Sequence, residues 1–99
     1  MEHYYIQGSN GKFFEPGRHK RNYVDADGIL YTVRVKTDTR GQRIYQPYRL
    51  VNDVYQPYRL VNGVFQERAV AEGYPTEQEA QAELDFYAIA FGLNEKEDE

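Results

Sequence analysis

The 99-residue chain contains no cysteine, which excludes disulfide bonds and thiolate metal sites. Its only two histidines, His3 and His19, fall in segments that we expect at the surface, and we predict neither a metal site nor a cofactor. No apolar run is long enough to cross a bilayer, and the N-terminal residues lack the basic start and apolar stretch of a signal peptide. We therefore expect a cytoplasmic protein that makes no contact with a membrane.

Side chains that support catalysis are also scarce. Without cysteine the nucleophile would be a hydroxyl group, and no serine or threonine has a histidine at a recognisable spacing. Asp25 and Asp27 could be imagined as an acid and a base, but the segment Asp-Ala-Asp-Gly is typical of a turn. The segment from Gly8 to Gly11 precedes no helix, so it predicts a hairpin turn and not a phosphate-binding loop. We expect that the protein is not an enzyme.

Alternating apolar and polar residues predict β-strands in the first two thirds of the chain. Residues 4–6 and 12–14 flank an Asn-Gly turn and predict a small N-terminal hairpin. Residues 29–36 form the clearest strand, and residues 43–51 alternate again. Because Pro47 has no amide hydrogen, the second of these strands should lie at a sheet edge or bulge at that residue.

A tandem duplication follows: residues 45–52 and 55–62 are the same octapeptide, Tyr-Gln-Pro-Tyr-Arg-Leu-Val-Asn. Each copy reads as a strand and a turn, and the second turn leads into a further predicted strand over residues 64–70. One inserted strand would reverse the direction of everything that follows it. The chain can loop out one copy, extend the sheet, or exchange strands with a second molecule. Because the copies are identical, two registers can also lie close in energy.

A C-terminal helix is the best-defined element. Thr76 and Glu79 form a T-x-x-E capping box, which predicts a helix over residues 77–91 that ends at Gly92. One apolar stripe of this helix should pack on the sheet. Its members are Ala80, Leu84, Tyr87, Ala88 and Phe91. Phe86 and Ile89, with Ala82, point away from that stripe and need a cover, from the N-terminal hairpin or from a second copy of the chain.

These patterns predict a single α+β domain over residues 1–93. We expect an antiparallel β-meander of three to four strands with an N-terminal hairpin, packed on one C-terminal α-helix. Residues 94–99 are mostly acidic, and we expect them to form a disordered tail.

Charge is sorted along the chain. Residues 1–68 carry eleven basic and seven acidic side chains, whereas residues 69–99 carry one lysine and nine acidic side chains. The acidic helix and tail could serve solubility alone. The alternative is that the sheet forms a basic surface which binds an anion.

The chain has ten tyrosines and no tryptophan. Five of the tyrosines fall in predicted strands close to arginines. They are Tyr31, Tyr45, Tyr48, Tyr55 and Tyr58, beside Arg34, Arg43, Arg49 and Arg59. Aromatic side chains among arginines suit stacking on bases or recognition of a protein surface. Tyrosines are also good strand formers whose rings can cover a thin core, so both interpretations remain open.

Three short segments resemble the arm-type, AP2-like DNA-binding domains of tyrosine integrases. They are Tyr31-Thr-Val-Arg-Val-Lys, Gly41-Gln-Arg, and Gly73-Tyr-Pro-Thr-Glu-Gln-Glu-Ala. The resemblance implies a three-stranded sheet packed on a C-terminal helix, with one sheet face in the major groove of duplex DNA. It implies DNA contacts from Arg34, Lys36, Arg40 and Arg43. The acidic helix and the duplicated strand depart from the family pattern.

Two functions follow from these observations. The first is a small protein-interaction module, whose partner is another protein or a second copy of itself in a homodimer or strand-swapped oligomer. Its contacts would come from Tyr45, Tyr48, Tyr55 and Tyr58 of the duplicated strand, and from Phe86 and Ile89. The alternative is a nucleic-acid-binding module that uses the basic sheet face with Arg34, Lys36, Arg40 and Arg43.

Overall fold

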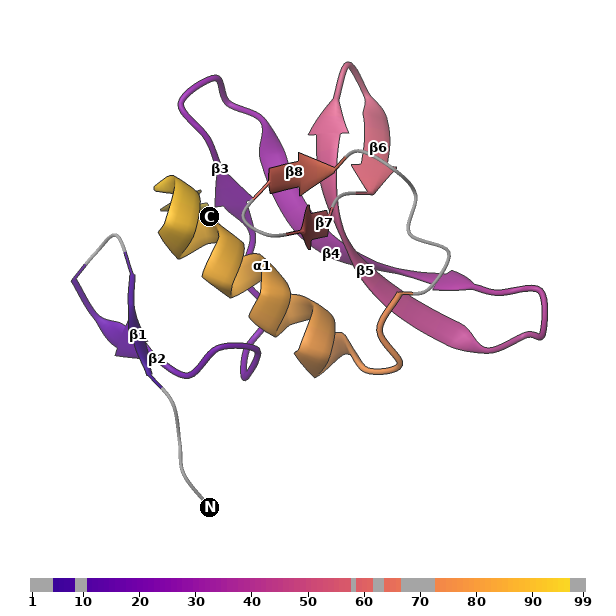
Figure 1. Ribbon diagram of the computed structural model, residues 1–99. Coiled ribbons are helices and arrows are strands. Elements are labelled where there is room, and N and C mark those ends of the chain that lie inside the picture. Colours follow the sequence, from indigo (N-terminus) through magenta and orange to yellow (C-terminus); the bar gives the residue numbers. More distant parts are fainter. Residues whose placement is uncertain (1–4, 9–10, 58, 62–63, 67–72, 97–99) are drawn as a thin grey trace.

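The computed structural model describes residues 5–8, 11–57, 59–61, 64–66 and 73–96. It shows a five-stranded antiparallel sheet with one helix across a face, an N-terminal hairpin and a second hairpin (Figure 1). The elements are β1 (Ile6–Gln7), β2 (Phe13–Phe14), β3 (Tyr23–Val24), β4 (Leu30–Thr37), β5 (Arg43–Val51), β6 (Val54–Pro57), β7 (Arg59–Val61), β8 (Val64–Gln66), α1 (Glu77–Phe91) and β9 (Asn94–Glu95). The predicted α+β fold with an N-terminal hairpin and a C-terminal helix is confirmed.

The main sheet has the strand order β6-β5-β4-β3-β9, so β3 to β6 form the predicted meander. Its turns use aspartate side chains in the way the sequence indicates. The Asp25 N–H donates to the Ile29 carbonyl, and its carboxylate accepts from the Asp27 and Ile29 N–H groups. The Asp38 carboxylate caps the β4–β5 turn by the same pattern. Asp25 and Asp27 therefore belong to a turn, as predicted.

The boundaries of α1 agree with the capping prediction. The Thr76 hydroxyl accepts a hydrogen bond of 3.2 Å from the Glu79 N–H, and Gly92 ends the helix with a left-handed φ of 68°. Glu77 and Glu79 lie in the first turn, where the helix dipole favours negative charge. These local signals place the helix, and packing then fixes which side faces the sheet.

The core lies between α1 and one face of the sheet. It consists of Tyr23, Tyr31, Val33, Ala80, Leu84, Tyr87, Ala88 and Leu93. Four of the five residues of the predicted stripe are buried, but Phe91 is 49% exposed and stacks on Tyr87 with 4.6 Å between the ring centroids. Phe91 is the last residue of the helix and is half exposed, so its assignment to the core was wrong.

The N-terminal segment covers part of the opposite side of α1. Gly17 lies so close to the helix that a Cβ there would be 3.0 Å from the Ala82 Cβ. Ile6 is buried, whereas Phe13 is 69% exposed. Phe86 and Ile89 remain 44% and 41% exposed. The cover expected from the N-terminal hairpin is therefore only partial at these two side chains.

The two copies of the octapeptide have different structures. The first copy lies in β5 and ends at the turn of Asn52 and Asp53, which have positive φ values of 50° and 63°. The second copy is divided between β6, which pairs with β5, and β7, which pairs with β8 in a separate two-stranded sheet. The strand predicted over residues 64–70 is described only as Val64–Gln66, and it does not join the main sheet.

Pro47 is accommodated in β5 because its missing amide hydrogen is not needed for pairing with β4. Tyr45 exchanges two backbone hydrogen bonds of 2.7 Å with Tyr74, so its polar groups point away from β4. Residues two apart in a strand point the same way, and the Pro47 nitrogen therefore also points away from β4. β5 lies between β4 and β6 and keeps a regular register with β4 through Pro47, so the expected sheet-edge position or bulge was wrong.

The second copy does not add one continuous strand to the main sheet. Val51 pairs with Val54 in the β5–β6 hairpin, and Val61 pairs with Val64 between β7 and β8. Tyr74 pairs antiparallel with Tyr45, so the chain approaches α1 in the direction opposite to β5.

The C-terminal boundary lies further along the chain than predicted. Asn94 and Glu95 form β9, which pairs with Val24 and Tyr23 of β3. The Lys96 N–H also donates to the Asn22 carbonyl at 2.8 Å. The sequence placed residues 94–96 in a disordered tail because it has no apolar pattern there, but backbone pairing needs none.

No helix in the described part of the chain has the length and apolar character to span a membrane.

Candidate functional site

The sheet face that points away from α1, here called the outer face, has a distinct composition. Since directly paired residues share a face, the strand registers define its members. They are Val24, Leu30, Thr32, Arg34, Lys36, Ile44, Gln46, Tyr48, Leu50, Tyr55 and Asn94. The alternation predicted for residues 29–36 is confirmed here, because Tyr31 and Val33 are buried against the helix and Arg34 and Lys36 are exposed.

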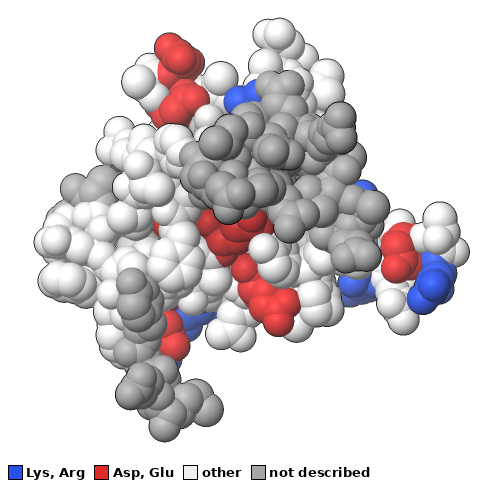
Figure 2. Space-filling view, in the orientation of Figure 1, with Lys and Arg blue, Asp and Glu red and all other residues white. Residues whose placement is uncertain are grey.

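Charge on the outer face has one sign. Arg34 and Lys36 are the charged side chains among its described members, and both are exposed. Acidic side chains of α1 lie on the other side of the sheet, where Figure 2 shows them at the centre of the helix side. The outer face therefore carries two basic side chains and no acidic one among its described members, whereas the helix side carries the acidic side chains of α1 together with arginines such as Arg43 and Arg49.

Aromatic rings hold Arg34 in place on the outer face. Its guanidinium carbon lies 3.7 Å from the centroid of the Tyr55 ring, in a cation–π contact that reaches across β5. Tyr48 meets Tyr55 edge to face, with 6.5 Å between the ring centroids. Burial raises the pKa of Tyr48, so its hydroxyl stays protonated and can donate a hydrogen bond at neutral pH. Gln46, beside Arg34 in the register, is buried.

The β4–β5 hairpin continues beyond the helix as a two-stranded arm (Figure 1). Arg40 lies in the turn of the arm, and Arg43 pairs with Thr37 immediately next to that turn. Both arginines are exposed. Lys36 pairs with Ile44 on the outer face, whereas Thr37 and Arg43 belong to the helix-side face. The structure thus brings Arg34 and Lys36 to one face, and places Arg40 and Arg43 along the arm.

The residues predicted for protein interaction are dispersed. Tyr48 and Tyr55 lie on the outer face, while Tyr45 pairs with Val35 on the helix side and packs against the core. Tyr58 lies outside the described residues. Phe86 and Ile89 are on α1, on the other side of the sheet from Tyr48 and Tyr55. The duplicated tyrosines and the helix residues therefore do not form one surface.

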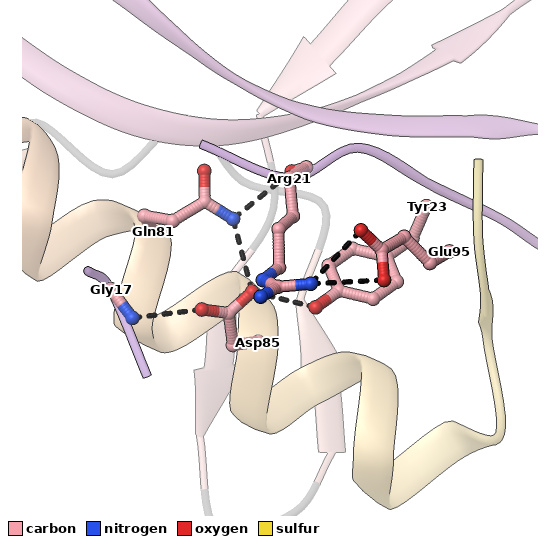
Figure 3. A network of polar contacts seen from close by, with 6 residues as sticks. All are labelled: Gly17, Arg21, Tyr23, Gln81, Asp85 and Glu95. Carbon is pink, nitrogen blue, oxygen red and sulfur yellow. Dashed lines mark hydrogen bonds and ion pairs between the residues drawn. The ribbon is translucent and has the colours of Figure 1, made fainter. Parts of the chain in front are cut away.

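A buried polar network around Asp85 joins α1 to the N-terminal segment (Figure 3). The Asp85 side chain is fully buried and accepts three hydrogen bonds, from the Gly17 N–H at 2.8 Å, the Tyr23 hydroxyl at 2.7 Å and the Gln81 amide at 3.1 Å. Next to it, Arg21 forms an ion pair with Glu95, with 2.9 and 3.0 Å between the Arg21 nitrogen and the two carboxylate oxygens.

Burial governs ionisation in this network. Loss of solvation raises the pKa of Asp85, although its three hydrogen bonds and Arg21 act in the opposite direction. Burial and the neighbouring Asp85 carboxylate raise the pKa of Tyr23. The Asp85 carboxylate is enclosed, and the three groups that donate to it come from the N-terminal segment, β3 and α1. It therefore holds the N-terminal segment, the helix and β3 together.

Sequence reasoning did not single out Asp85. One signal was present: apolar residues lie on both sides of this position around the helix, with Leu84 and Ala88 on one side and Ala82 and Phe86 on the other. Elements that cover both apolar stripes of the helix also cover an acidic residue that lies between the stripes, and that residue is then buried. Gln81, four residues earlier, lies on the same side and donates to it.

The described residues contain no group of three or more histidine, aspartate or glutamate side chains placed to hold a metal ion. Comparisons with protein-family models, curated proteins and solved structures gave no match for this chain.

Proposed function

We propose that this protein is a small nucleic-acid-binding module that uses the outer face of its sheet. The observation that carries the proposal is the separation of charge, with Arg34 and Lys36 exposed on that face and the acidic side chains of α1 behind the sheet. Contacts to phosphates supply most of the affinity of such modules. A basic face backed by an acidic one also orients the protein as it approaches a polyanion.

Three features support contact with the bases as well as with the phosphates. Stacking on Tyr55 limits the freedom of the Arg34 guanidinium, which can donate two parallel hydrogen bonds to a phosphate or a guanine edge. Tyr48 offers a hydroxyl beside it. The two-stranded arm, with Arg40 and Arg43, has the form of a β-ribbon that a major groove can admit. The resemblance of residues 31–36 to arm-type domains favours duplex DNA.

A salt titration tests the proposal. The affinity of the protein for a short duplex DNA is measured at several salt concentrations, for the wild type and for Arg34→Ala and Lys36→Ala. Loss of one phosphate contact should lower the slope of log affinity against log salt concentration by about 0.9. Lys12→Ala is the control, because it removes the same charge from β1–β2 on the helix side. Absence of binding at low salt, or an equal effect of Lys12→Ala, would overturn the proposal.

A second candidate is a protein-interaction module that associates with itself. It is favoured by the partial exposure of Phe86 and Ile89 on α1, at 44% and 41%. Burial of such side chains in a homodimer would contribute roughly 25 cal/mol per Å² of apolar surface. Sedimentation at several protein concentrations tests it, and Phe86→Ser should shift the equilibrium towards the monomer. A wild-type protein that stays monomeric throughout would contradict this candidate.

A further inference from the structure

The two hairpins that contain the duplicated octapeptide have the same strand register. In the β5–β6 hairpin the paired residues are Arg49 and Gln56, Leu50 and Tyr55, and Val51 and Val54. In the β7–β8 hairpin they are Arg59 and Gln66, Leu60 and Phe65, and Val61 and Val64. Each pair of the second hairpin has the residue types of the first, except that phenylalanine replaces tyrosine. The structure therefore contains two nearly identical hairpins, of which the first belongs to the main sheet and the second forms a sheet of its own.

The second copy carries the residues that β4 needs in a partner strand. In the structure β4 pairs with residues 43–50. If the second copy took their place, shifted by ten residues, the partners of residues 30–35 would keep their residue types, because all of these partners belong to the octapeptide. Ten is an even number, so each side chain would also stay on the same face of the sheet. Different partners would appear at the end of β4, where a valine would replace an isoleucine opposite Lys36 and Asp53 would replace Arg43.

The connections of the chain permit this exchange. Tyr74 and β6 both run antiparallel to β5, so a second-copy hairpin in the main sheet would lead along the same edge to Tyr74. Gln66 would lie where Gln56 lies now, and the seven residues from there to Tyr74 would pass four strand positions, about 13 Å. The connection after β4 would lengthen from residues 38–42 to residues 38–52. Tripling the length of a loop lowers an equilibrium constant only about fivefold.

The two turns differ in how well they suit their sequences. In the structure the turn between β5 and β6 requires two L residues with positive φ, Asn52 at 50° and Asp53 at 63°. The residues between Val61 and Val64 are Asn-Gly, the preferred sequence for such a turn. The shifted register would keep the Asn-Gly turn and release Asp53 from the left-handed conformation, whereas the observed register keeps one hairpin more. These two effects oppose each other and bring the registers close in energy.

We infer that the chain exchanges between two registers, in which the first or the second copy of the octapeptide occupies the place of β5. In the observed register Arg43 pairs with Thr37 in the arm. In the shifted register Asp53 pairs with Thr37, and Arg43 joins the long connection after β4. The exchange is thus a conformational switch that replaces a basic residue of the arm by an acidic one. Its effect on nucleic acid, which rests on the function proposed above, is weaker binding in the shifted register.

Engineered disulfides can report the register, because the chain has no cysteine of its own. Lys36 pairs with Ile44 in the observed register and with Val54 in the shifted one. Hydrogen-bonded pairs of antiparallel strands have Cα atoms about 5.5 Å apart, which a disulfide can bridge. In the observed register Val54 pairs with Val51, seven positions along β5 from Ile44, so a disulfide to position 36 would have to span roughly 23 Å.

The first test is therefore oxidation of Lys36→Cys with Val54→Cys under native conditions, and Lys36→Cys with Ile44→Cys is the matched control. Both should form a disulfide within one chain. Adding Asp53→Gly to the first variant should slow its oxidation by about threefold, because glycine favours the turn of the observed register. Adding Asp53→Val should speed it by about tenfold, because a β-branched residue disfavours that turn. The oxidised protein should keep the amide chemical shifts of Gly17 and Asp85, whose hydrogen bond reports the packing of α1.

Each outcome decides the inference. A disulfide between positions 36 and 54 within one chain, with the rate changes at Asp53 and the native shifts of Gly17 and Asp85, supports it. Failure to form this disulfide while the control forms would overturn it. A disulfide between two chains would also overturn it, because strand exchange between molecules would then explain the contact. Loss of the native shifts would overturn it as well, since the disulfide would then have trapped an unfolded chain.

The effect on nucleic acid is measured separately. Both oxidised variants lack Lys36, so their affinities for duplex DNA can be compared directly. Weaker binding by the variant joined at positions 36 and 54 supports the effect, and equal binding would overturn it. Absence of DNA binding by the wild type would overturn the proposed function and leave the disulfide result unchanged, so the two proposals can fail separately.

Discussion

Replacing Gly17 by alanine should destabilise the protein far more than replacing Gly28, although both glycines have a φ of 81°. A Cβ on Gly28 would meet no atom within 4 Å. A Cβ on Gly17 would overlap the carbonyl oxygen of Gln78 and lie 3.0 Å from the Ala82 Cβ. Both substitutions carry the same conformational cost, and only the first displaces the N-terminal segment from α1.

The expected magnitudes follow from these contacts. An L residue in the left-handed conformation costs about 1–2 kcal/mol, which is the loss expected for Gly28→Ala. At Gly17 the overlap adds about 1–3 kcal/mol of overpacking. Displacement would also weaken the hydrogen bond from the Gly17 N–H to the buried Asp85 carboxylate, and bonds of this kind contribute about 1.5–3 kcal/mol. The two variants should therefore differ by about 1–6 kcal/mol, depending on how far the hydrogen bond is weakened, with Gly17→Ala the less stable.

Urea unfolding followed by far-ultraviolet circular dichroism measures this difference, since the chain has no tryptophan to report on folding. The free energy of unfolding should decrease with urea concentration at the same slope in both variants, whereas the urea midpoints of unfolding should differ. Equal free energies of unfolding for Gly17→Ala and Gly28→Ala would refute the close packing of the N-terminal segment on α1.

Three further predictions concern the buried carboxylate and the duplication. Burial raises the folded pKa of Asp85 above the ordinary aspartate value of 3.8, so the folded state binds the proton more tightly than the unfolded state. The free energy of unfolding of the wild type, relative to that of Asp85→Asn, should therefore fall as pH rises from about 3.8 through the folded pKa. If the two free energies of unfolding changed with pH in the same way, this prediction would be contradicted. Asp53→Gly should stabilise the β5–β6 hairpin by roughly 0.5–1 kcal/mol, because Asp53 has a positive φ in a turn that favours Asn-Gly. Urea unfolding measures this change, and Asp53→Ala, which should lower the free energy of unfolding, is the control. Deletion of residues 53–62 should keep the packing of α1, since Val51 can then pair with Val64 across an Asn-Gly turn; loss of the native amide spectrum would contradict it.

Much of the fold could be predicted because its signals are local. The Thr76 cap and Gly92 end define α1 through two hydrogen-bonding motifs, and the alternation around Val33 separates the buried face from the outer face. Arg34 and Lys36 could be assigned to one exposed face for the same reason. These features depend on residues within a few positions of one another.

Features that depend on competition between similar segments could not be predicted. The sequence Arg-Leu-Val-Asn occurs before both turns, so each copy can form the same hairpin, and no local signal decides which one joins the main sheet. The second copy is divided between β6, which pairs with β5, and β7, which pairs with β8, and no local pattern distinguishes it from the first copy. Burial of Asp85 was also unforeseen, because it depends on Gly17, which is 68 residues distant in the chain.

The proposed nucleic-acid site is tested most directly by mapping amide chemical shifts while a short duplex DNA is titrated at low salt. Binding to the outer face predicts that the perturbed amides centre on Arg34, Lys36 and Tyr48 and extend along the arm to Arg40. The amides of Glu79 and Glu83 on α1 should change little. Perturbations centred on α1, or none at any DNA concentration, would contradict the assignment of the outer face as a nucleic-acid-binding surface.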